Sequence, residues 1–126
     1  MTGLRSPEAR VRGLGSAHHG LAHWWAQRIT AVALVPLMLW FVAHICAAVG
    51  ADYATARASL HQPVNAILTI LLVLAGFHHG QLGLQVVIED YVHVGWAKIS
   101  LIVLVKLLAV ALGAACIFAV LKVAFV

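Results

Sequence analysis

The sequence predicts an all-α integral membrane protein with three transmembrane helices. Hydrophobic residues make up 63% of its 126 residues and charged residues only 10%, and the mean hydropathy is +1.01. Soluble domains contain about 25% charged residues. Three apolar stretches are long enough to cross a hydrocarbon core of about 30 Å, which takes about 20 helical residues. They lack the alternation of apolar and polar residues typical of a membrane β-strand, so each is expected to be a helix.

The chain is expected to begin with a basic segment, residues 1–28, ahead of a membrane domain at residues 29–126. Trp24 and Trp25 precede the first apolar stretch, where paired tryptophans are typical of an anchor at the membrane interface. Arg28 can extend its side chain to lipid phosphates. A cleaved signal peptide is the poorer interpretation, because the apolar stretch is too long and cleavage would remove Arg28. The segment also contains Arg5, Arg10, Arg12, His18, His19 and His23.

Two prolines mark the predicted spans. Pro36 is expected to kink the first helix, which membrane helices tolerate where neighbouring groups satisfy the freed carbonyl. Pro63 follows a short, partly polar connection at residues 52–62 and is placed to begin the second helix. Cys46 and Cys116 are expected to be buried free thiols rather than a disulfide. The predicted spans are residues 29–49, 64–88 and 99–125.

Basic residues are distributed unevenly between the two sides of the predicted membrane domain. The chain has a net charge of +4, and the N-terminal segment and the second connection, with Lys98, are basic, whereas the first connection has only Arg57. The positive-inside rule therefore places the N-terminus and the second connection in the cytoplasm, and the C-terminus on the periplasmic side. No nucleic-acid module, Walker loop or G-x-S-x-G motif is visible, so nucleic-acid binding, nucleotide binding and hydrolase activity are not expected.

His79 lies deep within the second predicted span, where an ionisable side chain needs a specific reason. A charge at the bilayer centre costs about 2.5 to 3.5 kcal/mol even on lenient scales, so such a residue is a functional-site candidate. On a helical wheel Gly76 and Gly83 flank His79, and Asp90 shares this face about 16 Å further along. The glycines could leave a flat slot for a planar macrocycle bound by the imidazole. Equally, Gly76 and Gly80 could pack against another helix with which His79 forms a hydrogen bond.

A second axial ligand for such a macrocycle is expected from another chain. One histidine supplies one axial bond, and a six-coordinate haem needs two. His44 lies about 22 Å into the first span, whereas His79 lies about 14 Å from the same membrane surface, so their depths do not match. His78 points about 100° away from His79, toward Gln81 and Gln85, and is the weaker candidate for a ligand.

Glu89, Asp90, Tyr91 and His93 cluster where the second helix reaches the membrane surface. Acids at a helix C-terminus oppose the helix dipole, so they need partners or solvent. A tyrosine hydroxyl beside a carboxylate offers a hydrogen-bond donor and a proton acceptor, as the reduction of a lipid-soluble quinone requires. The alternative is an interfacial tyrosine with solvated acids. Lys106, in the third span, is expected to extend toward the cytoplasmic surface.

Two motifs make the chain resemble the smaller hydrophobic anchor subunit of bacterial succinate dehydrogenase, the small subunit of cytochrome b556. The resemblance covers about residues 19–122. The motifs are Gln27-Arg28-x-Thr30-Ala31 at the first span and His79-x-x-x-Gly83 followed by Glu89-Asp90-Tyr91-Val92 in the second.

The resemblance implies a haem b with His79 as one axial ligand and a histidine of the companion anchor subunit as the other. Arg28 matches the family's arginine near the haem propionates and the quinone pocket, and Gly83 belongs to the glycine-lined slot. Tyr91 would form a hydrogen bond with a ubiquinone carbonyl, and Asp90 would position that site or relay protons.

The resemblance also implies a four-subunit complex in the bacterial inner membrane, respiratory complex II, which passes electrons from succinate to ubiquinone in the tricarboxylic acid cycle and the respiratory chain. The expected partners are the cytochrome b556 large subunit as second membrane anchor, an iron-sulfur subunit, a flavoprotein subunit and membrane lipid. The chain alone would have no activity. A fumarate reductase anchor, a cofactor-free structural anchor and a small proton-coupled transport subunit are the alternatives.

Overall fold

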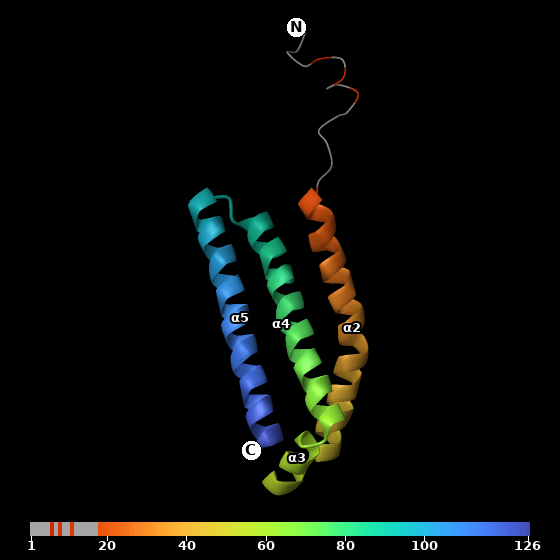
Figure 1. Cartoon of the computed structure of the whole chain (residues 1–126). Coiled ribbons are helices and arrows are strands. Elements are labelled where there is room, and N and C mark those ends of the chain that lie inside the picture. The colour runs from red at the N-terminus through yellow and green to blue at the C-terminus, as the bar shows by residue number, and fades with distance from the viewer. Residues whose placement is uncertain (1–5, 7, 9–10, 12–17) are drawn as a thin grey trace.

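The computed structural model of the chain describes Ser6, Glu8, Val11 and residues 18–126. All of the regular secondary structure among these residues is helical. The predicted basic tail, with Arg5, Arg10 and Arg12, lies outside the described residues, as do the side chains of His18 and His19. The helices are α2 (His18–Ala48), α3 (Tyr53–Leu60), α4 (Pro63–Tyr91) and α5 (Gly95–Phe125), shown in Figure 1.

Three of these helices are long and apolar enough to cross a membrane, namely Gly20–Ala48, Pro63–Tyr91 and Gly95–Phe125. This confirms the predicted all-α membrane fold with three spans. The helices extend beyond the predicted spans, most of all at the start of α2. Hydropathy locates the part of a helix that lies in hydrocarbon, whereas the helix itself continues into the interface until its backbone turns.

The connection between α2 and α4 contains α3, a short helix that the sequence analysis assigned only as a partly polar connection. Gly50 has a φ of 81° and turns the chain after α2, a conformation that glycine adopts without strain. Asp52 then caps α3, because its Oδ1 accepts a hydrogen bond from the Thr55 backbone N–H at 2.9 Å. Hydrogen bonds from the Thr55 side chain and backbone lower the pKa of the Asp52 carboxyl. Pro63 begins α4, as predicted.

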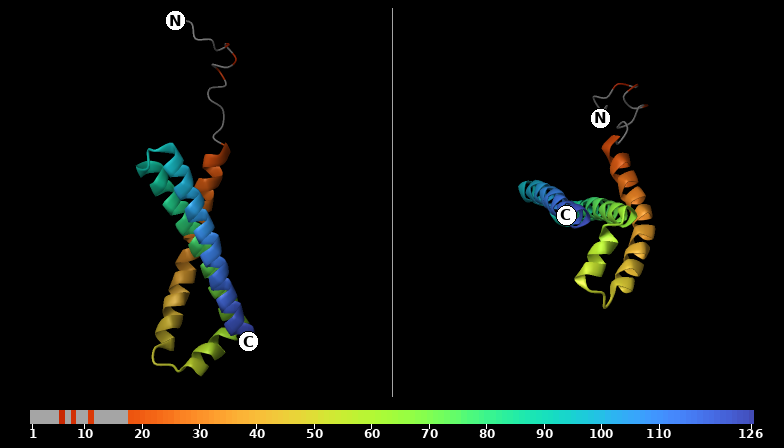
Figure 2. Two further views of the ribbon diagram at one scale, coloured as in Figure 1. Left: turned by 90° about the vertical axis from the view of Figure 1, so that its left-hand side faces the viewer. Right: turned by 60° about the horizontal axis from the view of Figure 1, so that its bottom comes forward.

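The three long helices form a layer with α4 in the middle. Helix α4 packs against α2 on one side and α5 on the other, and α3 contacts α4 and α5. Figure 1 shows this order, and the right-hand view of Figure 2 shows the three long helices in a row. We call the end with the start of α2, the end of α4 and the start of α5 the upper end, as drawn in Figure 1.

Very little of this layer is buried within the chain. The buried apolar residues are Ala66, Leu82 and Ala124, and at most 6% of the most apolar window of each long helix is buried. Large side chains such as Leu39 and Leu107 are exposed at 70% and 64%. Apolar surface on this scale is stable only against lipid or partner subunits.

Two smaller expectations concern α2 and the cysteines. Helix α2 runs through Pro36 as one continuous helix. Cys46 and Cys116 are free, as predicted, but the prediction that they are buried is wrong, because both are exposed on the outer surface of this thin layer of helices.

Candidate functional site

A polar contact joins α4 to α2 through His79. Its Nδ1 lies 2.9 Å from Oγ1 of Thr30, and both side chains are partly buried. The Thr30 hydroxyl also donates a hydrogen bond to the carbonyl oxygen of Ala26 at 2.7 Å. The imidazole therefore has a partner inside the chain, as a polar group in a lipid-embedded helix requires.

The Thr30 contact also favours one tautomer of His79. A hydroxyl has one hydrogen, and Thr30 gives it to Ala26, so the Thr30 oxygen accepts a hydrogen bond from the ring. This network assigns the proton to Nδ1 and leaves a lone pair on Nε2. Histidines that bind metals almost always donate a hydrogen bond from their other ring nitrogen in this way.

Gln27 lies next to the free lone pair of His79. Its Nε2 is 3.5 Å from Nε2 of His79, beyond the usual range of about 2.7 to 3.2 Å, so this hydrogen bond is weak. A Cβ at Gly83 would lie 3.6 Å from the same Gln27 atom, so the absence of a side chain at Gly83 gives Gln27 room against α4. Oε1 of Gln27 is buried and has no hydrogen-bond partner among the described atoms. An unsatisfied buried polar atom of this kind needs an explanation, and a functional role is one.

The residues around His79 fit one axial ligand of a haem iron rather than a complete metal site. Within the described part of the chain, no three His, Cys, Asp or Glu side chains are grouped as metal ligands. His44 lies near the lower end, where its Nε2 is 3.4 Å from Oγ of Ser59 and its ring stacks on Trp40 at 5.2 Å. His44 is therefore not part of the polar contact around His79, and a second ligand for a metal bound at His79 would have to come from outside the described residues.

Gly76 and Gly80 lie on an open apolar face of α4. No described atom would come within 4 Å of a Cβ at either glycine, and both line a groove of about 540 Å³. Leu34 of α2 and Leu108 of α5 form its walls. Close helix packing through this glycine pair is therefore not formed within the chain, whereas the hydrogen bond from His79 to a neighbouring helix is. The face remains accessible to a partner helix or to a planar group.

Asp90 and Tyr91 end α4 at the upper end of the bundle. Both are exposed, Tyr91 at 79%. The backbone carbonyl oxygen of Tyr91 is 3.0 Å from Nδ1 of His93. Because α4 is continuous from Pro63 to Tyr91, the tyrosine lies about 18 Å along the helix from His79. The structure thus places these predicted residues in two separate regions.

Glu89 is held by neighbours on both sides of the connection between α4 and α5. Its Oε1 accepts a hydrogen bond from Nε2 of Gln85 at 2.8 Å. Nζ of Lys98 donates to the Glu89 carbonyl oxygen at 3.0 Å. A lysine at the carbonyl end of the helix offsets the unfavourable placement of acids there.

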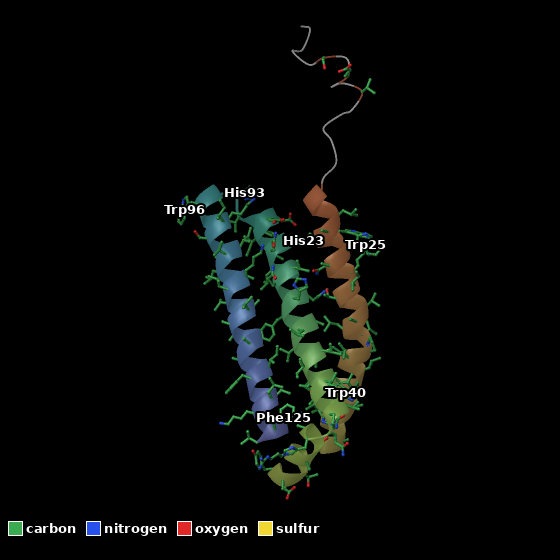
Figure 3. The ribbon with its side chains drawn as sticks, in the orientation of Figure 1. His23, Trp25, Trp40, His93, Trp96 and Phe125 are labelled. Atoms are coloured by element: carbon green, nitrogen blue, oxygen red, sulfur yellow. The ribbon has the colours of Figure 1, made fainter. Side chains whose placement is uncertain are left out.

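Arg28 lies beside the interfacial tryptophans. Its guanidinium carbon is 4.2 Å from the centre of the Trp24 ring, and Trp24 meets Trp25 edge to face at 5.1 Å. Figure 3 shows Trp25 on the side of α2 that faces away from α4. Arg28 is therefore not part of the contact between Thr30 and His79 within this chain.

The sequence analysis assigned no role to Gln27 or Thr30, although both stand in the motif that carries the resemblance. Their role could have been predicted from the sequence, because two polar residues three positions apart lie on one face of a helix. In an apolar helix such a pair indicates that this face meets another polar side chain, here His79.

Comparisons with known proteins agree on one family. Residues 2–121 match the family described as succinate dehydrogenase/fumarate reductase transmembrane subunit. The chain is 36% identical over 107 residues to a succinate dehydrogenase hydrophobic membrane anchor subunit of Rickettsia bellii, which covers 85% of this chain and 86% of the relative. It is 35% identical over 97 residues to the protein of the same name from Paracoccus denitrificans, covering 77% and 75%. A succinate dehydrogenase membrane anchor subunit of Reclinomonas americana is 28% identical over 97 residues, covering 72% and 78%.

The contact at Gly83 leads to a test of the α2 and α4 interface. Gly83→Ala places a Cβ at ordinary contact distance from Gln27, so we expect a change in unfolding free energy within about 0.5 kcal/mol. Gly83→Leu displaces Gln27 and should cost about 1 to 3 kcal/mol. Unfolding of the purified chain in detergent measures both. Gly80→Leu, on the open face, is the matched control, and equal losses for the two leucine variants would contradict the assigned contact.

Proposed function

The chain belongs to the family of succinate dehydrogenase/fumarate reductase transmembrane subunits, and we propose that it anchors a succinate:ubiquinone oxidoreductase, respiratory complex II, in the bacterial inner membrane. In this role it contributes one haem b ligand and part of the ubiquinone reduction site. The observation that supports the proposal is the hydrogen bond between His79 and Thr30, since it orients an imidazole within an apolar helix and leaves Nε2 as the nitrogen for a metal, once the Gln27 amide at 3.5 Å moves aside.

His79 is the proposed axial ligand. A haem b bound there supplies a one-electron redox centre inside the membrane. The chain holds the imidazole ring through its Nδ1 hydrogen and brings the Gln27 amide close to Nε2. The face of α4 at Gly76 and Gly80 carries no side chains and stays open. Arg28, at the interfacial end of α2, is available for an anionic propionate or for the quinone pocket.

Tyr91 and Asp90 are the proposed contribution to the quinone site. Reduction of a quinone to a quinol takes up two electrons and two protons, and the protons go to the two carbonyl oxygens. The Tyr91 hydroxyl can donate a hydrogen bond to one carbonyl oxygen, and the Asp90 carboxylate can relay a proton from water. Both groups are exposed at the upper end, where a partner can cover them.

The proposed partners are a second anchor subunit that supplies the other haem ligand, an iron-sulfur subunit that delivers electrons at the upper end, and a flavoprotein subunit that oxidises succinate. The extensive exposed apolar surface of the layer supports an assembly in which another membrane subunit covers part of it. The chain has no activity by itself in this proposal. An anchor of a fumarate reductase remains the second candidate, because the family description includes both enzymes.

Substitution of His79 tests the haem assignment. His79→Gln keeps an amide that can form a hydrogen bond with Thr30 but removes the imidazole, so the assembled complex should lose its haem or lose six-coordinate ligation. His78→Gln, on another face of α4, should keep the haem. Haem content and reduced-minus-oxidised spectra of the two assembled complexes measure this, and an unchanged spectrum in His79→Gln would contradict the assignment.

Substitution of Tyr91 tests the quinone site separately. Tyr91→Phe removes one hydrogen-bond donor, which in a water-poor site costs about 1 to 3 kcal/mol of transition-state stabilisation. Quinone reduction should therefore fall about tenfold or more, while haem content and succinate oxidation with an artificial acceptor stay unchanged. Tyr53→Phe, at the lower end of the bundle, is the matched control. A normal quinone reductase rate in Tyr91→Phe would mean that Tyr91 is only an interfacial anchor and not part of the quinone site.

The proposed orientation places the upper end in the cytoplasm. After replacement of Cys46 and Cys116 by alanine, single cysteines at positions 57 and 93 can be exposed to a membrane-impermeant maleimide in cells with a permeabilised outer membrane. We expect labelling at position 57 and protection at position 93. The opposite pattern would invert the orientation and would place the quinone site on the wrong side for its electron donor.

A further inference from the structure

Two further hollows lie along α4 and α5, and the proposed function uses neither. The upper one, about 710 Å³, has a mixed polar and apolar lining. The lower one, about 320 Å³, is mainly apolar. The two share His78, Gln81 and Val110, so they adjoin, and we treat them as the two parts of one groove. The side chains that matter in the upper part are His23, His78, Gln85, Glu89 and Lys106.

We propose that this groove binds an ethanolamine phospholipid of the leaflet at the upper end, with its phosphate between Lys106 and His23 and its ammonium group near Glu89. One acyl chain would follow the apolar part along α4 and α5. The inference does not rest on the haem or the quinone site, but only on the chain lying in a membrane.

Along the membrane normal, the negative and positive side chains of the groove, Glu89 and Lys106, complement the two charges of this lipid headgroup. Glu89 lies about 3 Å below the end of α4, and Lys106 lies about 16 Å below the start of α5. Side chains lean toward the N-terminus of their own helix. Helices α4 and α5 are antiparallel, so Glu89 leans down and Lys106 leans up, and their charged ends approach each other. The acid is outermost and the base is deeper, as are the ammonium and the phosphate of an ethanolamine headgroup.

The depth of Lys106 also suits a phosphate. Helix α5 has 31 residues, about 46 Å, so about 8 Å extends beyond a 30 Å hydrocarbon core at each end. The Cα of Lys106 is then about 8 Å inside the boundary, and its side chain can span most of this distance by extending upward. The ammonium then lies close to the hydrocarbon boundary.

His23 provides a separate indication of a ligand. Its Nε2 is buried and has no hydrogen-bond partner among the described atoms, although the residue lines the polar part of the groove. Figure 3 shows His23 near the upper end of the bundle. A phosphate oxygen would satisfy this nitrogen when it carries a hydrogen and the ring turns toward the groove.

The lower part of the groove can accept an acyl chain. Phe77 and Ile117 line it, and a Cβ at Gly113 would lie 3.6 Å from the Phe77 ring. Gly113 therefore lets the ring lie close to α5, which leaves a continuous apolar track below His78. A quinone has no anionic group to pair with the Lys106 ammonium, so a zwitterionic amphiphile is the better fit.

The test measures binding of two defined lipids to the purified, delipidated four-subunit complex by native mass spectrometry. Phosphatidylethanolamine should bind more tightly than phosphatidylglycerol. Lys106→Met should weaken binding of both lipids about tenfold or more, because a charge-assisted hydrogen bond to phosphate is lost, and Lys106→Arg should restore it. Glu89→Gln should remove the preference for phosphatidylethanolamine and keep binding of the phosphate. Lys122→Met, at the lower end of α5, is the matched control.

Haem spectra and quinone reduction are recorded on the same samples and should not change in the Lys106 and Glu89 variants, which separates this proposal from the proposed function. Equal lipid binding in Lys106→Met and Lys122→Met would overturn the proposal. So would a photo-crosslinker at Val110 that couples to the companion anchor subunit or to quinone instead of to phospholipid.

Discussion

The bundle depends on the requirement that a polar group inside lipid must find its partner within the protein. His79 meets this requirement through Thr30, which in turn bonds to the carbonyl of Ala26. This chain of hydrogen bonds fastens α4 to α2 and also fixes the tautomer of the imidazole. In the proposed function the same interaction would also orient the imidazole as a metal ligand, since the nitrogen bonded to Thr30 is the one that a metal would not use.

The central place of α4 gives each of its faces a different environment. One face carries His79 toward α2, a second presents Gly76 and Gly80 in an open apolar groove, and a third carries His78 in a polar groove that reaches α5. The end of the helix exposes Asp90 and Tyr91. The proposed haem, quinone and lipid would therefore contact different parts of this one helix.

Hydropathy and length were sufficient to predict the three long helices, since a continuous apolar stretch in lipid has no other stable backbone structure. They could not predict α3, because a helix of eight residues outside the membrane depends on local features, namely the turn at Gly50 and the cap at Asp52. The helical wheel placed His79 on a glycine-flanked face but did not identify its partner. Periodicity describes one helix at a time, whereas the contact with Thr30 depends on how α2 and α4 pack. The location of Arg28 on the Trp24 ring is likewise a property of the folded chain.

The most direct test of this account is the midpoint potential of the haem in complexes that carry Thr30→Val or Thr30→Ser. The hydrogen bond from Nδ1 makes the imidazole a more basic ligand and stabilises the oxidised iron. Thr30→Val removes the acceptor at nearly constant volume, so the midpoint potential should rise, with haem content unchanged, whereas Thr30→Ser keeps an acceptor and should stay near the wild-type value. Equal potentials in all three complexes would contradict the claim that Thr30 prepares His79 for its ligand.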